Sequence, residues 1–292
     1  MLTIVLVCFL SFALGAILGQ FLVKRGVQGD FRLERHQGSI LGGLILLTIV
    51  ILATVAFQNS EFGESFPSLL PNIVQVYCQA MIWHLILGMC CLGMGMLIFL
   101  EKGRWRSRWH IIQLFVALVL IALPFSLVLH YSRPVSASVL GKPKTVEAIV
   151  LQTTDYTCVP AAIATLMRYT ERDPNFSEAE ALRLTKTSRW GTPTLSQIRA
   201  LHQLGFQPSY ETRLTVEDLA QRQEFAILSV NEPIGDQTIS HAVVLLSVSP
   251  EQQEVTIANP LYGKETKTDQ EMEEYWMGQA VYVEEKFKKT SS

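Results

Sequence analysis

The sequence contains no CxxC pair and no phosphate-cradling GxxxxGK[ST] loop. A zinc site and a P-loop ATPase segment therefore have no sequence support. The second half also lacks a basic stripe. Residues 1–144 carry 11 Lys and Arg against 5 Asp and Glu, whereas residues 145–292 carry 13 against 21. This asymmetry predicts two physically different halves, and the acidic second half argues against nucleic-acid binding. We expect no metal and no cofactor.

Charge is absent from four long apolar stretches in the first half. A bilayer-spanning helix needs about 20 such residues, and lipid requires every backbone group to be bonded within the helix. The sequence therefore predicts an α-helical membrane domain, a four-helix transmembrane anchor in contact with the lipid bilayer, over residues 1–132. A linker rich in Pro, Ser and Gly follows at 133–144, and a second domain occupies 145–292. The four spans are roughly Leu2–Val23, Ile40–Phe57, Ile73–Leu100 and Ile111–Tyr131.

The loop between the second and third spans has no Lys or Arg, whereas the first and third loops have four each. Positively charged loops stay in the cytoplasm. We therefore expect a multi-pass protein of the cytoplasmic membrane with both termini and the second domain on the extracytoplasmic side. The first span lacks a basic n-region, so we interpret it as a retained helix. A transporter or channel has little support, because the spans lack a charged or Gly/Pro-broken pathway, and the isolated His84 is more typical of packing than of a proton relay.

The second half has the pattern of an α+β domain. Ser177, Thr194 and Thr268 are each followed three residues later by Glu or Gln, and these capping boxes predict three helix starts. The order of a strand, then helices, then a run of strands favours α+β over alternating α/β. The β-branched and apolar segments that predict strands are residues 146–152, 224–231, 241–248, 254–259 and 278–285.

Cys158 is the only cysteine of the second half, so a disulfide within that half is not expected. Pro160 suits the first turn of a helix, which puts Cys158 at the helix N-terminus. The helix dipole there favours a thiolate, which is a usable nucleophile. A lone cysteine at a helix start is nevertheless more often an inert packing residue. The other four cysteines lie in apolar stretches and are interpreted as packing residues: Cys8, Cys78, Cys90 and Cys91.

A nucleophile needs a base, and His241 opens an apolar strand that turns into another strand ending at Asn259. If the hairpin turns near residue 250, His241 and Asn259 fall almost opposite each other. The Asn oxygen could then accept a hydrogen bond from the imidazole and aim the other ring nitrogen at Cys158. Gln152 could add a side-chain donor to an oxyanion hole, which is a weak signal on its own. His202 lies mid-helix and is more typical of a surface or packing role.

The stretches VLQTTDYTCVPAAIATLMRYT, GTPTLSQIRALHQLGF, ISHAVVLLSV and IANPLYG, in this order, resemble the bacteriocin-processing, double-glycine leader peptidases. These are papain-like cysteine peptidases best known as domains of peptide-exporting ABC transporters. The resemblance covers about residues 145–287. It implies an α+β papain-like cysteine peptidase domain with Cys158 as nucleophile, His241 as base and Gln152 in the oxyanion hole. Asn259 stands where the family usually has Asp, and Val159 where it usually has Gly.

The sequence thus leaves two hypotheses. The first is a membrane-anchored cysteine endopeptidase that cleaves a peptide or leader peptide, with Trp190, Gly191 and Thr192 bordering the substrate cleft, as the glycine-containing loop of the family implies. The second is a non-catalytic peptide-binding module of the same fold, whose spans dock a membrane transporter or sensor partner. The intact Cys158 and His241 favour the first hypothesis, and Asn259 and Val159 keep the second open.

Overall fold

The computed structural model describes residues 2–25, 71–100, 112, 126 and 130–286. The chain divides into two compact units, one of Met1–Leu69 with Cys78–Tyr131 and one of Leu70–Tyr77 with Ser132–Ser292. The predicted span at 40–57, and nearly all of that at 111–131, lie outside the described residues. The predicted division at residues 132 and 144 stays a prediction.

The first unit contains the helix α1 (Leu2–Lys24) and most of the helix α4 (Asn72–Leu100), whose residues up to Tyr77 belong to the second unit. Among the described residues one helical segment, Val5–Lys24, is long and apolar enough to cross a membrane. Helix α4 contributes a shorter apolar stretch, His84–Met96. The prediction of four transmembrane helices is therefore not confirmed. A single apolar helix near the N-terminus is compatible with a membrane anchor or with a signal sequence.

Helices α1 and α4 approach each other at small residues. A Cβ atom added to Gly15 would overlap the carbonyl of Leu92, and one added to Gly95 would overlap the carbonyl of Phe12. Both glycines therefore let two backbones touch. Close contact at small residues is typical of helices that associate in lipid. No hydrophobic effect drives such helices together, so van der Waals packing has to hold them.

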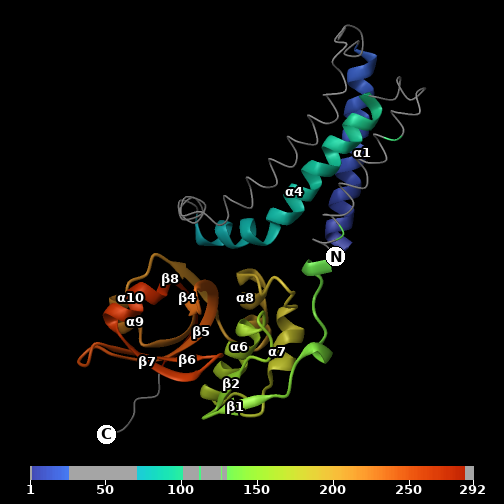
Figure 1. Cartoon of the computed structure of the whole chain (residues 1–292). Coiled ribbons are helices and arrows are strands. Elements are labelled where there is room, and N and C mark those ends of the chain that lie inside the picture. The colour runs from blue at the N-terminus through green and yellow to red at the C-terminus, as the bar shows by residue number, and fades with distance from the viewer. Residues whose placement is uncertain (1, 26–70, 101–111, 113–125, 127–129, 287–292) are drawn as a thin grey trace. The chain divides into compact units, whose positions relative to one another are not determined.

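The second unit is an α+β domain, as the sequence predicts. Its main sheet is antiparallel, with strand order β3-β8-β4-β5-β6-β7, and a separate hairpin pairs β1 with β2. The hairpin and the helices α6, α7 and α8 lie on one side, and α9 and α10 lie with the main sheet on the other (Figure 1). The strands are β1 (Lys144–Val146), β2 (Ile149–Leu151), β3 (Ser209–Thr212), β4 (Glu224–Ile234), β5 (Gln237–Ser249), β6 (Glu254–Asn259), β7 (Gly263–Thr268) and β8 (Trp276–Lys286). The helices are α6 (Cys158–Tyr169), α7 (Glu178–Thr185), α8 (Thr194–Gln203), α9 (Val216–Arg222) and α10 (Asp269–Tyr275).

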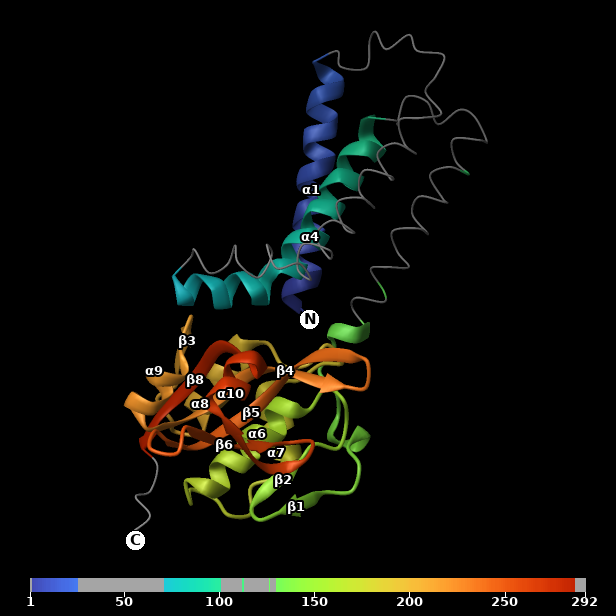
Figure 2. The same ribbon diagram turned by 60° about the vertical axis from the view of Figure 1, so that its left-hand side comes forward.

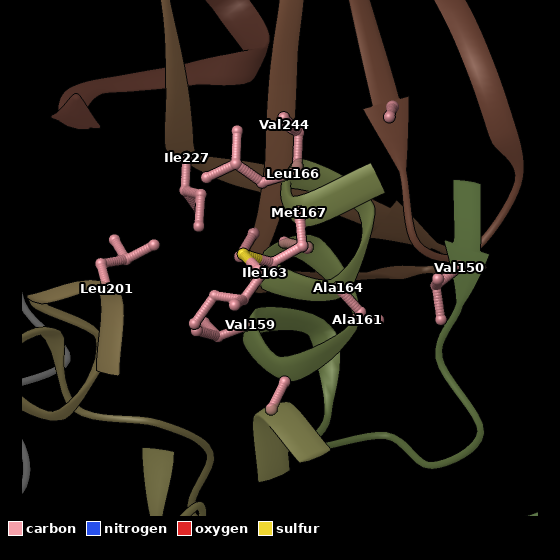
Figure 3. Close-up of a cluster of buried hydrophobic side chains, with 14 of the residues drawn as sticks. Val150, Val159, Ala161, Ile163, Ala164, Leu166, Met167, Leu201, Ile227 and Val244 are labelled. Atoms are coloured by element: carbon pink, nitrogen blue, oxygen red, sulfur yellow. The ribbon is translucent and has the colours of Figure 1, made fainter. Parts of the chain in front are cut away.

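The sheet is buried on both faces, and α6 supplies much of one core. Every residue of α6 from Val159 to Met167 is buried. The side chains of Ile163 and Leu166 face Ile227 of β4 and Val244 of β5 (Figure 3). A buried Leu of this kind stabilises a fold by about 2–5 kcal/mol relative to Ala. The core therefore holds α6 at a fixed position on the sheet (Figure 2). Cys158 is the first residue of this helix.

Two local predictions are wrong. The strand predicted over residues 146–152 is interrupted at Glu147 and Ala148, which both have positive φ, as a tight hairpin turn requires. The cap predicted at Thr194 is also wrong: Pro193 is the N-cap of α8 and makes no side-chain cap bond. The capping boxes at Ser177 and Thr268 are confirmed, and a third at Thr215 was not anticipated.

Candidate active site

A short, heavily hydrogen-bonded loop delivers Cys158 to the start of α6. The Thr157 hydroxyl donates to the carbonyl of Thr154 at 3.1 Å and accepts from its N–H at 3.3 Å. Upstream, the N–H of Thr153 donates to the buried carboxylate of Glu178 at 3.0 Å. These bonds turn the chain from β2 into the helix and leave Cys158 as its first residue, as the position of Pro160 predicts.

Cys158 is half-buried, and its sulfur lies beside the strand that carries His241. Burial raises the pKa of the Cys158 thiol, because a desolvated thiolate is disfavoured. Hydrogen bonds from the backbone N–H groups of Ala242, Val159 and Cys158 itself act in the opposite direction on that pKa. The N–H of Ala242 therefore ties the sulfur to the residue that follows His241.

His241 and Asn259 lie on the neighbouring strands β5 and β6, and both are buried. His241 Nε2 is 3.0 Å from Asn259 Oδ1. The register differs by two residues from the predicted one. A bulge between Leu245 and Ser247 leads to the pair Val244–Ala258, so Asn259 lies diagonal to His241. Side chains two positions apart on a strand share a face, and the hydrogen bond forms despite this offset.

The other end of the Asn259 amide contacts two acidic side chains that no sequence motif singled out. Its Nδ2 lies 2.9 Å from Glu232 Oε2 and 2.9 Å from Glu265 Oε2. The hydroxyl of Tyr275 donates to the same oxygen of Glu232. A signal for Glu232 existed in the sequence: it continues the series Ala226, Leu228, Val230 on alternate positions of an apolar strand, where a carboxylate must be buried.

Burial lowers the pKa of His241, because the imidazolium loses hydration. The hydrogen bond to Asn259 and the charges of Glu232 and Glu265 raise that pKa again in part. With the thiol pKa of Cys158 raised, both shifts favour an uncharged cysteine and histidine at neutral pH. Such a pair would react by general-base transfer of the thiol proton during attack.

Gln152 lies at the end of β2, next to the strand that ends at Asn259. Its backbone N–H donates to the carbonyl of Pro260 at 2.9 Å. Its side-chain Oε1 is buried and has no hydrogen-bond partner among the described residues. The backbone of Gln152 is thus held beside the Asn259–Pro260 turn. The part of the Gln152 side chain in an oxyanion hole stays a prediction.

The predicted substrate-binding residues belong to the loop between α7 and α8. Trp190 is 60% exposed, and Gly191 has φ of +91°. Thr192 is hydrogen-bonded to Thr187 at 2.6 Å, which pins the loop to the end of α7. A pinned loop with an exposed tryptophan is compatible with the border of a cleft, and its contact with substrate stays a prediction.

The described residues contain no group of three or more His, Cys, Asp and Glu side chains that could hold a metal ion. Cys158, His241 and Asn259 are instead the residue types of a nucleophile, a base and an orienting amide. Such a group can perform acyl transfer through a thioester.

Residues 147–288 match the model of the peptidase C39 family. This match confirms the resemblance predicted from the sequence motifs, and it covers the C-terminal domain alone. Comparison with the curated proteins gave no match.

Three of the solved structures that match the chain come from peptide transporters or bifunctional ABC transporters. The peptidase domain of Streptococcus ComA, described as a bifunctional ABC transporter of a quorum-sensing pathway, is 21% identical over 45% of this chain and 93% of that one, with a TM-score of 0.39. A double-glycine-motif protease from an AMS/PCAT transporter, in complex with the leader peptide, is 19% identical over 49% and 91%, with a TM-score of 0.38. The peptidase domain of Streptococcus mutans ComA is 20% identical over 46% and 96%, with a TM-score of 0.35.

Proposed function

We propose that the protein is a membrane-anchored cysteine endopeptidase that cleaves leader peptides of the double-glycine type. One observation carries the proposal: in a domain that matches the peptidase C39 family, His241 is hydrogen-bonded to Asn259, and the adjacent Ala242 N–H contacts the sulfur of Cys158. A nucleophile, a base and a group that orients the base therefore lie on adjoining elements.

In the proposed reaction, the thiol proton of Cys158 moves to Nδ1 of His241 as the sulfur attacks the peptide carbonyl carbon. The resulting oxyanion accepts hydrogen bonds from the backbone N–H of Cys158 and the side chain of Gln152. His241 then gives its proton to the leaving amine, and a thioester remains on the sulfur. A water molecule, deprotonated by His241, hydrolyses the thioester, releases the carboxylic acid and restores the thiol.

We further propose that the first half is a four-span anchor that holds the peptidase domain on the extracytoplasmic side. The apolar helix Val5–Lys24 and the glycine contacts between α1 and α4 support a membrane location. The distribution of Lys and Arg between the loops supports the orientation. A peptide-exporting transporter is the partner that this arrangement fits, because it would deliver the substrate to the same side.

A second candidate function is a non-catalytic peptide-binding module. The raised pKa of the Cys158 thiol favours it, because a resting thiol is a poor nucleophile. The two functions differ in whether His241 activates the sulfur when an electrophilic peptide occupies the site.

The deciding experiment is labelling of intact cells with a membrane-impermeant peptide electrophile directed at thiols. We expect labelling that is lost in Cys158→Ala and strongly reduced in His241→Ala, with His202→Ala as the matched control because His202 is exposed on α8. Labelling only after permeabilisation would place the domain in the cytoplasm. Absence of labelling in folded protein under both conditions would exclude the peptidase and favour the binding module.

A further inference from the structure

The side-chain amide of Asn259 uses all its hydrogen-bonding positions, and its partners identify which atom is the oxygen and which is the nitrogen. Its Oδ1 lies 3.0 Å from the backbone N of Leu261 and 3.0 Å from His241 Nε2. Its Nδ2 lies 2.9 Å from each of Glu232 and Glu265. An amide offers two donor hydrogens and two acceptor positions, so all four are used.

These partners fix the proton on the imidazole. A backbone N–H can only donate, so the atom facing Leu261 must be the amide oxygen. A carboxylate can only accept, so the atom facing Glu232 and Glu265 must be the amide nitrogen. Because the oxygen also faces His241, Nε2 of the imidazole must carry the proton. The neutral ring then has its lone pair on Nδ1, which is the nitrogen that a general base needs.

Glu232 is the buried anchor of this arrangement. The residue is 4% exposed. Its carboxylate accepts from Asn259 and from the hydroxyl of Tyr275, and it forms no ion pair with any described Lys or Arg. Lys267 lies over the ring of Tyr275, with Nζ 4.3 Å from the ring centroid. The hydrogen bonds from Tyr275 and Asn259 stabilise the carboxylate. Its negative charge stabilises a positive charge that forms nearby.

We propose that Glu232 is a positioning residue for His241 that acts through Asn259. It holds the amide in the orientation that protonates Nε2, and together with Glu265 it supplies the negative charge that stabilises the imidazolium. Asn259 is neutral and cannot supply that charge itself. The catalytic part of this inference rests on the proposed function. In the step concerned, the proton leaves the sulfur of Cys158 and binds Nδ1, Nε2 keeps its own proton, and Glu232 takes up none.

The test is Glu232→Gln in the full chain, in detergent micelles. Glutamine can still accept from Asn259 through its own oxygen, so it removes the charge and retains the shape. The exposed Asp236 on the β4–β5 turn supplies the matched control Asp236→Asn, which removes the same charge elsewhere. The ring nitrogens of the histidines are labelled with ¹⁵N, because their spectrum distinguishes a protonated nitrogen from one with a lone pair.

We expect wild type to show a proton on Nε2 and a lone pair on Nδ1 of His241. In Glu232→Gln, the tautomer stays, the titration midpoint of His241 moves to lower pH, and alkylation of Cys158 by iodoacetamide at pH 7 slows by about tenfold. At metal sites, loss of the group that hydrogen-bonds the other ring nitrogen of a ligating histidine lowers metal affinity or activity by a factor of this order. The other titratable groups that act on this site are Cys158, Tyr262, Glu265, Lys267 and Tyr275, and all remain in this variant.

A proton on Nδ1 in wild type would overturn the proposal. So would a His241 midpoint in Glu232→Gln that equals those of wild type and Asp236→Asn. If Glu232→Gln does not fold, Tyr275→Phe replaces it, because it removes the hydroxyl that donates to Glu232 and that lies 3.4 Å from Asn259 Nδ2. That variant keeps the carboxylate of Glu232 and removes a hydrogen bond that offsets its charge, so we expect the His241 midpoint to move to higher pH. An unchanged midpoint would overturn the proposal. A wild-type thiol no faster than free cysteine would refute the peptidase, whereas the ring-nitrogen spectra would still decide the role of Glu232.

Discussion

Replacing Asn259 with Asp is predicted to damage the protein, although the two side chains have nearly the same shape. The amide nitrogen of Asn259 lies 2.9 Å from two carboxylate oxygens, of Glu232 and Glu265. In Asn259→Asp, an oxygen takes the place of that nitrogen. Two donated hydrogen bonds become contacts between like charges in a site where Glu232 is buried.

The structure limits the free-energy cost of the Asn259→Asp substitution. Two unit charges about 2.9 Å apart repel by about 6 kcal/mol at an effective dielectric constant of 20, and the introduced carboxylate would meet two such neighbours. The site can avoid this repulsion by binding a proton. Holding a carboxyl with an ordinary pKa of about 3.9 in its neutral form costs about 1.4 kcal/mol per pH unit above that value. The cost is thus limited to about 1.5 kcal/mol at pH 5 and about 5.5 kcal/mol at pH 8.

The sign of the pH dependence follows from linkage. The shared proton raises the folded-state pKa above its unfolded value, so the folded variant binds more protons than the unfolded chain. Its stability is therefore retained below pH 4 and lost as the pH rises toward the raised pKa. Domains of this kind have only about 5–15 kcal/mol of stability in total, so Asn259→Asp should be close to unfolding at pH 8.

The assay is urea unfolding of the full chain in detergent, followed by tryptophan fluorescence at pH 5 and pH 8. We expect the free energy of unfolding of Asn259→Asp to fall between these two pH values by several kcal/mol more than that of wild type. Adding Glu232→Gln should recover part of the loss, since it removes one of the two repulsions. A variant as stable as wild type at pH 8 would refute the carboxylate contacts on which this reasoning depends.

Three further predictions address other parts of the molecule. Gln152→Ala should lower kcat by about 10²–10³-fold with little change in KM, measured on a peptide in which a double-glycine leader site is followed by further residues, whereas the exposed control Gln207→Ala should match wild type. Gly15→Leu should lower the thermal stability of the first unit in detergent by about 1–3 kcal/mol, because a side chain there overlaps the backbone of α4; Gly93→Leu is the control, since a Cβ at Gly93 meets nothing within 4 Å. Burial holds the pKa of His241 below its ordinary value of 6.5, so the unfolded chain binds more protons there and stability should fall as the pH drops through that value. If the unfolding free energy of His241→Gln falls equally over the same pH range, other groups cause this loss.

The sequence predicted the chemistry of the site better than its geometry. Cys158 stands out because Pro160 marks a helix start, and the structure begins α6 at that cysteine. The hydrogen bond between His241 and Asn259 was expected from a hairpin argument, and the structure contains it, with the strands offset by two residues. The offset comes from the bulge after Leu245, and no local residue pattern announces a bulge of this kind.

The sequence by itself determined the properties that depend on local patterns. The apolar helix α1, the capping boxes at Ser177 and Thr268 and the α+β order of the second half belong to this class, because each depends on residues only a few positions apart. Tertiary structure decided the surroundings of Asn259. Glu232, Glu265 and Tyr275 reach it from three different elements, at separations of 27, 6 and 16 residues along the chain. Only the pairing of β4, β5, β6 and β7 in one sheet, covered by α10, brings these groups within hydrogen-bonding distance, and that pairing is set by the packing of the whole core.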